Sequence, residues 1–513
     1  MKLILAASAA LAAYLVWQSF GWPLIHDAPL MHYIAWVIAE GGVPYRDVFD
    51  MNLPGVYLLH AAIIAVGGRG DLAWRLFDLG WLAATMAVLW AYARPLGRGP
   101  AAAGTLLFGL YHLAGGAWRV GQRDFLLCLF LLAGALGVAR SIEATRAAPV
   151  RQGTPVVAVL ERGGALPPLV WTGLALGAGL AIKPHAGVFW IAAGALAGWG
   201  ARRRGLRPAV AAMAIVLGLG LVPSALVFTW LASRGGAGPF VDVFTGYVVP
   251  LYSRVGRVSL ATALGWYQYG ALLWTLLLAL ALLGLARATP GHGVRKVIAA
   301  VGAVCGALHF FLQGKYWEYQ LYPLAAFLCA LVPFAMREMA LPRAAALTRF
   351  RPAALGHRAA LVTFAATVAV LGAKGADALE PAWIADKARR VAAMTRDLGP
   401  LLPPGGTVQV MDVTEGGVHA LYNLGRRQPT RFIYDFHFFH DTADPRIRRL
   451  RDEFVAGISA GRPAAIVILR DTWNHEGYER LDDWPAIEDL LARDYRLAVD
   501  GDGYRIYAKR ADS

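Results

Sequence analysis

The chain has 513 residues, of which 57% are hydrophobic and 16% are charged, and its mean hydropathy is +0.48. Soluble globular proteins carry about 25% charged residues. The 57 Gly and 17 Trp of this chain suit membrane helices, which are rich in Gly and bordered by aromatic residues. The composition therefore excludes a disordered chain, a collagen and a nucleic-acid-binding module, and it predicts a polytopic α-helical membrane protein.

The net charge of +15 is unevenly distributed along the chain. Residues 374–513 hold 20 Lys and Arg against 22 Asp and Glu, which leaves 29 basic and 12 acidic residues for positions 1–373. Those basic residues cluster in short loops, at 202–204, 295–296 and 343–358. Short loops rich in Lys and Arg stay in the cytoplasm. The charge thus indicates membrane topology and no nucleic-acid partner.

Twelve apolar stretches of residues 1–373 are candidate spans. They fall at 3–25, 55–67, 72–94, 100–117, 125–139, 168–182, 186–200, 208–232, 263–286, 297–313, 320–336 and 359–373. A membrane-spanning helix needs about 20 residues, so the shorter stretches tilt or stop part-way, and we expect about 11–13 spans. The basic loops predict that 140–167, 201–207, 287–296 and 337–358 are cytoplasmic. Topologies counted from the two ends disagree by one crossing between residues 26 and 124, and 55–67 is the stretch most suspected of not crossing fully.

After residue 373 the composition becomes that of a soluble domain, which the topology places outside the membrane at 374–513. β-branched and aromatic residues predict strands at Val408–Met411, Arg431–Tyr434, Ala465–Leu469, Tyr495–Val499 and Tyr504–Ala508. Helical patterns at 445–460 and 484–493 lie between them, which favours a small α/β domain.

The first external loop, residues 26–54, holds four of the twelve acidic residues of the membrane part: Asp27, Glu40, Asp47 and Asp50. An apolar helical segment (30–39) follows Asp27, Gly41 and Gly42 end it, and Pro44 predicts an extended segment at 45–47. One interpretation is a polar loop whose acids avoid the bilayer. The other is a general base, since a carboxylate among apolar neighbours is a stronger base.

Several motifs support the second interpretation. In the first loop, Asp27 is followed by Tyr33-x-Ala35, Gly42-Val43-Pro44-Tyr45-Arg46-Asp47 and Pro54. Further along the chain come Gly121-Gln122-Arg123-Asp124, Gly173-x-x-x-Gly177-x-Gly179-x-x-x-Lys183, and Lys315-Tyr316-Trp317-Glu318-Tyr319-Gln320-Leu321-Tyr322-Pro323. Together they resemble the membrane-embedded GT-C glycosyltransferases, a group that includes protein O-mannosyltransferases and aminoarabinose lipid A transferases. The resemblance covers nearly the whole chain through loose motifs. It implies a transmembrane GT-C domain at 1–373 and a bacterial inner-membrane location.

The resemblance also implies the reaction and its partners. Such enzymes move a sugar from a polyprenyl-phosphate carrier to the hydroxyl of a glycan, lipid or protein. The resemblance assigns the role of the catalytic carboxylate to Asp27 and, less directly, to Asp47. Many relatives have an Asp-Glu pair in this loop, whereas Ala28 follows Asp27 here. No metal ligand is therefore assigned, and a divalent metal ion stays an open cofactor.

A leaving lipid phosphate needs fixed positive charge near the headgroups. The expected phosphate ligands are Lys315, Arg123 and Lys183, at ends of apolar segments, with Tyr316, Tyr319 and Tyr45 as aromatic partners of the sugar. Each cation has a structural alternative: a snorkelling side chain for Lys315, an ion pair with Asp124 for Arg123, and a helix terminus for Lys183.

Two rival functions remain open. A transporter or flippase for lipid-linked sugars would carry its charges at mid-membrane and show repeated halves, and neither feature is visible here. An O-antigen ligase or polymerase would use Arg254 and Arg257 in the loop 233–262. Separately, His437, His440 and Asp441 have a spacing that could bind metal, although a surface loop with aromatic packing is the preferred interpretation.

Overall fold

The computed structural model describes residues 1–147, 164–337, 352–379, 381–473 and 476–511. Most of the cytoplasmic loops predicted at 140–167 and 337–358 thus lies outside the described residues. The chain divides into two compact units. Unit 1 comprises Met1–Trp22, Arg75–Val227 and Arg257–Leu379, and unit 2 comprises Pro23–Trp74, Phe228–Gly256 and Glu380–Ser513. The C-terminal residues thus group with the first loop and with most of the loop after residue 233.

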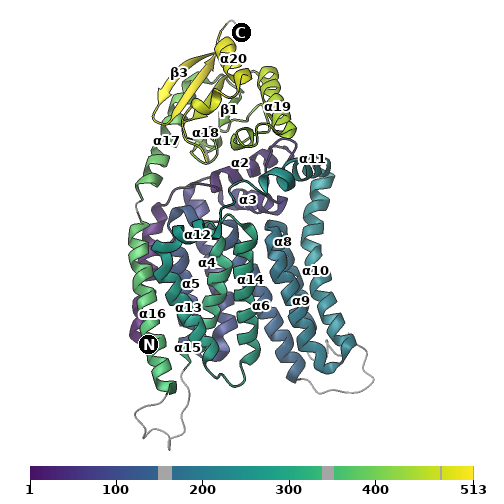
Figure 1. Cartoon of the computed structure of the whole chain (residues 1–513), viewed down its shortest axis with the longest axis vertical. Coiled ribbons are helices and arrows are strands. Elements are labelled where there is room, and N and C mark those ends of the chain that lie inside the picture. The colour runs from purple at the N-terminus through teal and green to yellow at the C-terminus, as the bar shows by residue number, and fades with distance from the viewer. Residues whose placement is uncertain (148–163, 338–351, 380, 474–475, 512–513) are drawn as a thin grey trace, which may run out of the picture. The chain divides into compact units, whose positions relative to one another are not determined.

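Unit 1 is a bundle of helices (Figure 1). The start of α4 and the end of α10 belong to unit 2, and the rest of both helices to unit 1. The main elements of unit 1 are α1 (Lys2–Gln18), α4 (Asp71–Ala93), α5 (Arg98–Leu113), η3 (Ala117–Arg119), α6 (Arg123–Ala147), α8 (Leu166–Ile182), η4 (Pro184–Ala186), α9 (Gly187–Ala201), α10 (Leu206–Ser233), α12 (Leu260–Tyr267), α13 (Ala271–Ala286), α14 (Gly293–Gln313), η8 (Glu318–Leu321), α15 (Tyr322–Met336) and α16 (Pro352–Asp377). Every apolar stretch expected in this unit is helical.

Within the described residues, seven helices are long and apolar enough to cross a membrane, or eight if the bent pair α12 and α13 forms one span. The chain is therefore an integral membrane protein. This count is below the 11–13 spans expected, because α5, α8 and α9 have only 16, 17 and 15 residues. The stretch suspected of not crossing, 55–67, forms a helix of 14 residues that belongs to unit 2.

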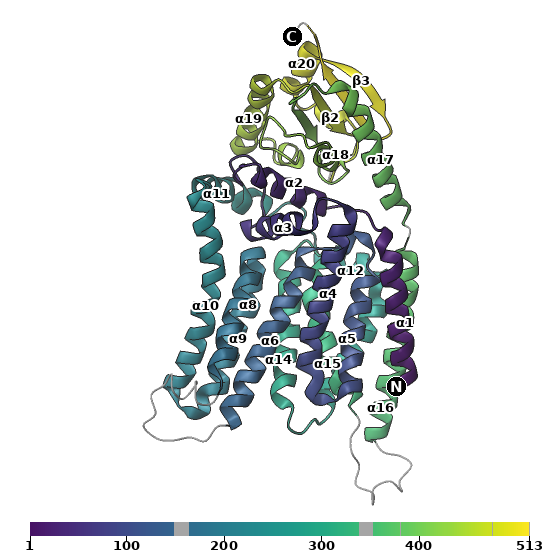
Figure 2. The same ribbon diagram turned by 180° about the vertical axis from the view of Figure 1, so that it is seen from behind.

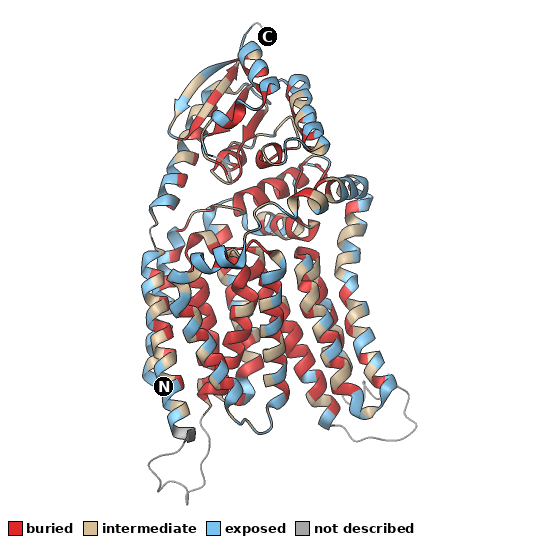
Figure 3. Ribbon diagram, in the orientation of Figure 1, coloured by how far each residue is buried: buried red, intermediate tan, exposed pale blue. Residues whose placement is uncertain are grey.

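Burial separates the centre of the bundle from its lipid-facing helices (Figure 3). In the segment that begins with η8 and runs through α15, 94% of the residues in the apolar 18-residue stretch are buried, whereas 17% of those in α10 are. Exposed leucines such as Leu221 and Leu226 cover α10, as expected for a helix that lipid surrounds. The glycines of α8 allow close packing with α10, since a Cβ on Gly173 would lie 2.8 Å from Leu219 Cβ.

Unit 2 combines short helices with one mixed sheet. Its elements are α2 (Ala28–Ala39), α3 (Pro54–Gly67), α11 (Ala237–Val243), the π-helix η6 (Phe244–Tyr252), α17 (Ala382–Leu398), β1 (Val408–Met411), α18 (Gly417–Leu424), η11 (Phe436–Phe438), α19 (Pro445–Gly461), β2 (Ala465–Leu469), α20 (Pro485–Asp494), β3 (Tyr495–Gly501) and β4 (Tyr504–Lys509). The strand order is β1-β2-β4-β3, with β1 parallel to β2 and the other pairs antiparallel. Figure 2 labels β2 and β3 of this sheet.

Four of the five predicted strands and both predicted helices are confirmed. The strand predicted at Arg431–Tyr434 is wrong. Val408 N donates to Arg427 O, and Val410 N donates to Gln428 Oε1. Residues 427–428, which come just before the predicted strand, therefore occupy the free edge of β1. Phe432 makes only an isolated bridge with Phe49. The β-branched and aromatic residues of this segment therefore pack against neighbouring side chains and add no strand to the sheet.

The first loop folds around α2. His26 precedes the helix with a φ of 63°, and Gly41 follows it with a φ of 86°, so the predicted helix and its glycine end are confirmed. The extended segment predicted at 45–47 is wrong, because Tyr45 has a φ of 67° and its N–H donates to Val48 O at 2.8 Å. A tight turn thus positions Asp47.

Candidate active site

Lys315 lies in the short connection between α14 and η8, after Gly314, whose φ of 65° ends α14. Its side chain is 8% exposed, and its ammonium lies 5.1 Å from the centre of the Trp317 ring. Burial, reinforced by the positive charges of Arg123, Lys183 and Arg257, lowers the pKa of Lys315 from 10.5 to about 7. Four cations from separate segments of unit 1 therefore converge here.

Lys183 belongs to a buried polar group within this cluster. Its Nζ donates to Asp124 Oδ2 at 2.6 Å, and His309 Nε2 lies 2.5 Å from Asp124 Oδ1. The structure thus gives the Asp124 carboxylate two partners, Lys183 and His309. Lys183 is held by an ion pair rather than snorkelling, and its ammonium lies 6.0 Å from the Tyr319 ring.

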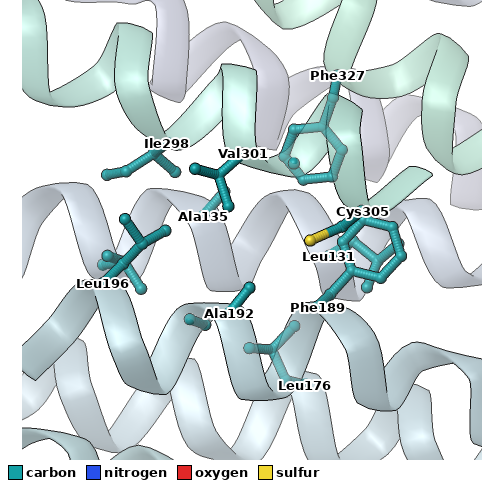
Figure 4. A pocket seen from close by; sticks show the side chains of 13 residues that line it. Leu131, Ala135, Leu176, Phe189, Ala192, Leu196, Ile298, Val301, Cys305 and Phe327 are labelled. Carbon is teal, nitrogen blue, oxygen red and sulfur yellow. The ribbon is translucent and has the colours of Figure 1, made fainter. Parts of the chain in front are cut away.

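Unit 1 contains a small apolar pocket (Figure 4). It is lined by Leu131, Phe189, Cys305 and Phe327 among others, and it encloses about 30 Å³. The Phe189 ring lies 6.2 Å from the His309 ring. A cavity of this size holds at most a few water molecules, so the pocket does not accommodate an isoprenoid tail.

A second charged group surrounds Glu318, in the same motif as Lys315. Arg119 and Lys374 both form ion pairs with the Glu318 carboxylate. The Arg119 guanidinium is 1% exposed and lies 5.2 Å from the Tyr111 ring and 5.7 Å from the Tyr322 ring. These contacts fix η8 and therefore the loop that carries Lys315.

A third polar group lies between α4, α5 and α15. Asp78 Oδ2 accepts a hydrogen bond from Arg75 at 2.5 Å and lies 3.0 Å from His112 Nε2. Asp78 Oδ1 accepts from Gly121 N at 3.0 Å, and His112 Nδ1 lies 2.8 Å from the Tyr322 hydroxyl. Asp78 thus holds both the segment before Arg123 and the start of α15. Sequence reasoning missed this group, although ionisable residues inside apolar stretches were a visible signal.

The predicted aromatic partners have different environments. The Tyr316 ring packs 5.1 Å from Phe310, and its carbonyl accepts from the Tyr267 hydroxyl at 2.7 Å. Tyr319 is 5% exposed. Tyr45, in unit 2, is fully buried and donates to Asn52 O at 2.6 Å, so it offers no surface on which a sugar could stack. Trp317, which contacts the Lys315 ammonium, was missed.

The two predicted catalytic carboxylates both belong to unit 2. Asp27 directly precedes α2, and its side chain is 31% exposed. Its Oδ1 lies 3.9 Å from His26 Nε2. Burial lowers the pKa of His26, so the ring is neutral at neutral pH and supplies no positive charge to Asp27.

Asp47 is held by its sequence neighbours. Arg46 donates to both carboxylate oxygens, at 2.9 and 2.8 Å, and Val43 N donates to Oδ2 at 2.8 Å. The hydrogen bonds from Arg46 lower the pKa of Asp47. A carboxylate with a lowered pKa is a weaker base. Asp50 is buried and accepts from the Tyr57 hydroxyl at 2.5 Å, so its role is to close the loop.

The metal-like spacing in the C-terminal part has a structural explanation. His437 is fully buried, against the rings of Phe49, Tyr247 and Phe436, and burial holds its pKa well below the ordinary value. The expected aromatic packing is confirmed, but the expected surface position is wrong for this residue. Among the residues that the structure describes, no three His, Cys, Asp or Glu lie together as a metal site would require. The described residues therefore do not fit a metal site.

Unit 1 thus contains a buried group of four cations. Unit 2 contains a partly exposed carboxylate. The chain has the GT-C fold. No family model matches the chain, and no curated protein matches its sequence. Solved structures do match. The ArnT structure from Cupriavidus metallidurans bound to undecaprenyl phosphate has 15% identity and a TM-score of 0.58, over 99% of this chain and 98% of that one.

The Archaeoglobus fulgidus oligosaccharyltransferase in its apo form also matches. It has 12% identity and a TM-score of 0.53, over 99% of this chain and 74% of that one. The same organism's AglB, in complex with an inhibitory peptide and a dolichol-phosphate, has 11% identity and a TM-score of 0.52 with the same coverage. At such identities the likeness concerns the fold.

Proposed function

We propose that this chain transfers a sugar from a polyprenyl-phosphate-linked donor to an acceptor hydroxyl at the outer face of a bacterial inner membrane, with the C-terminal domain outside. The observation that carries the proposal is the convergence of Lys315, Arg123, Lys183 and Arg257 in one part of unit 1. The matched structures support it, since ArnT is described with bound undecaprenyl phosphate and AglB with a dolichol-phosphate.

The cationic group suits a leaving phosphate. Burial and the neighbouring cations make the charged form of Lys315 unfavourable, and a phosphate oxygen would offset that cost. As the bond between the anomeric carbon and the phosphate oxygen breaks, negative charge grows on the leaving group, and fixed cations then bind it more tightly. Arg123, Arg257 and Lys183 share this work, with Asp124 and His309 fixing Lys183.

The acceptor oxygen forms the new bond to the anomeric carbon and gives its proton to a carboxylate, and the carrier departs as polyprenyl phosphate. Asp27 is the preferred base. Its side chain is partly exposed, whereas Arg46 binds both oxygens of Asp47. Attack opposite to the phosphate would invert the anomeric centre, as the resemblance implies. The donor panel described next is designed to identify the sugar.

The test is transfer by the purified full chain in liposomes, offered a panel of polyprenyl-phosphate sugars, with release of carrier phosphate as the readout. We expect turnover by the wild type and a loss of about 10²–10⁴-fold in Asp27→Asn. Asp242→Asn, which changes an exposed acid of the same unit, serves as the matched control. Loss in Asp47→Asn alone would move the base to Asp47.

The rival functions predict other results. A flippase would move the donor between leaflets without releasing carrier phosphate from any member of the panel. A ligase that depends on Arg254 would lose activity in Arg254→Glu, whereas the present proposal expects little change there. Arg257 does not discriminate between these two, because it also lies in the cationic group around Lys315.

A further inference from the structure

Unit 2 contains a polar cleft separate from the carboxylate of Asp27. It encloses about 380 Å³ and lies between α2, the turn at 46–47 and the segment 427–433. Its lining includes Tyr33, Arg46, Asp47, Arg427, Gln428 and Arg431. Small-molecule sites typically measure about 300–1,000 Å³, so one or two sugar rings fit. The polar lining does not suit an acyl or isoprenoid chain.

The cleft carries a surplus of positive charge. Three arginines face one carboxylate, and that carboxylate is already bound by Arg46. Arg431 is engaged elsewhere, since it donates to both Glu453 oxygens at 2.6 and 2.8 Å. Arg427 is exposed, and among the described residues its guanidinium has one hydrogen bond, from Nη2 to Val37 O at 3.4 Å. Most of its donors are therefore available to a ligand.

The backbone holds this arrangement. Gly42 has no side chain, and a Cβ there would lie 2.7 Å from Arg427 Nη2, so the glycine makes room for the guanidinium. Gln428 is anchored to the sheet, because Val410 N donates to its Oε1 at 2.9 Å. Its own N–H donates to the Tyr33 hydroxyl at 3.1 Å. Arg427 thus extends from a fixed segment, at the side of Asp47.

We propose that this cleft binds an acidic saccharide, whose carboxylate or phosphate group meets Arg427 and Arg46 while its hydroxyls bond to Asp47, Tyr33 and the threonines of the rim. In the transfer reaction it would seat the acceptor glycan beyond the reacting hydroxyl. That role rests on the proposed function, whereas recognition of the acidic saccharide does not. Asp47 is then a binding residue rather than the base, which agrees with its ion pair to Arg46.

The experiment measures binding to the full chain in nanodiscs of neutral lipid by titration calorimetry. The probes are tetragalacturonic acid, a phosphorylated mannose oligosaccharide and neutral maltotetraose. We expect at least one acidic probe to bind about tenfold or more tightly than maltotetraose, with an affinity that falls as salt rises. The preferred acidic probe distinguishes carboxylate from phosphate.

Arg427→Gln should weaken that probe about tenfold, the value of one charge-assisted hydrogen bond, and Arg427→Lys should restore part of it. Arg389→Gln is the matched control, since it alters a guanidinium that is 76% exposed on α17. Equal binding of acidic and neutral probes, or no effect of either Arg427→Gln or Arg46→Gln in folded protein, would overturn the proposal. Competition by anionic lipid added to the nanodiscs would instead assign the cleft to a membrane headgroup.

This binding assay needs no turnover. If acidic saccharides bind but no donor is turned over, the proposal for the cleft stands and the proposed transferase function is rejected. If turnover is lost in Asp27→Asn and the wild type binds no acidic probe, the transferase function stands and the proposal for the cleft is rejected.

Discussion

Replacing Lys315 by Met should make the protein more stable and less able to bind its donor. Met has a similar length without the charge, so it keeps the contact with Trp317. The difference between the ordinary pKa of 10.5 and about 7 corresponds to roughly 5 kcal/mol of unfavourable free energy for the buried ammonium. That figure is an upper limit to the stabilisation, because the protein relaxes around the charge.

The effect on stability depends on pH in a defined direction. Folding lowers the pKa of Lys315, so the unfolded chain holds this proton more tightly than the folded chain. The penalty is complete below about pH 7, shrinks as the pH rises to 10.5, and is absent above it. Lys315→Met should therefore raise the unfolding temperature most at pH 6, and by less than half as much at pH 9.

Donor binding should have a matching pH profile. A phosphodiester donor keeps one negative charge over this range, so any change in its affinity reports on the protein. We expect a constant affinity below about pH 7 and then a fall of up to tenfold per pH unit, as binding must supply a proton to Lys315. In Lys315→Met the profile should be flat, with an affinity at pH 6 about 10–100-fold lower.

The assays are differential scanning fluorimetry and calorimetric titration of a polyprenyl phosphosugar, in detergent at pH 6 and pH 9. Lys509→Met, on β4, is the control for the same substitution in the other unit. A lower unfolding temperature for Lys315→Met at pH 6, together with unchanged donor affinity, would refute the reasoning. A wild-type affinity that does not vary between pH 6 and pH 9 would refute it equally.

Two further substitutions test the packing of unit 1. Asp124→Asn should destabilise the protein by about 3–5 kcal/mol, because Lys183 is then buried without its counter-charge. The double variant Asp124→Asn, Lys183→Met should recover part of that loss, and failure to recover any would argue against the pair. Gly173→Ala should lower the unfolding temperature, since the new Cβ would meet Leu219. Gly218→Ala, with no atom within 4 Å, should raise it slightly, and equal effects at the two sites would contradict the close packing of α8 and α10.

The sequence by itself determined the elements. Hydropathy predicted the α-helices of unit 1, with α12 and α13 as a single stretch, because the length and apolarity of a membrane span are local properties of the sequence. Four strands followed from β-branched content in the same way. The strand prediction at Arg431–Tyr434 failed although the segment has the composition of a strand. Residues 427–428 already occupy the edge of β1, which composition does not reveal.

Only the tertiary structure decided which charges meet. Lys183 lies 59 positions along the chain from its partner Asp124, and His309 lies 185 positions from it. Arg119 forms its ion pair with Glu318 from a different connection between helices. Composition placed Lys315 near the end of a helix, but its surrounding cations and its Trp317 contact depend on how α6, α8 and α14 pack. Ion pairing is set by distances through space, and a buried charge is stable only where the fold brings its partner within a few ångströms.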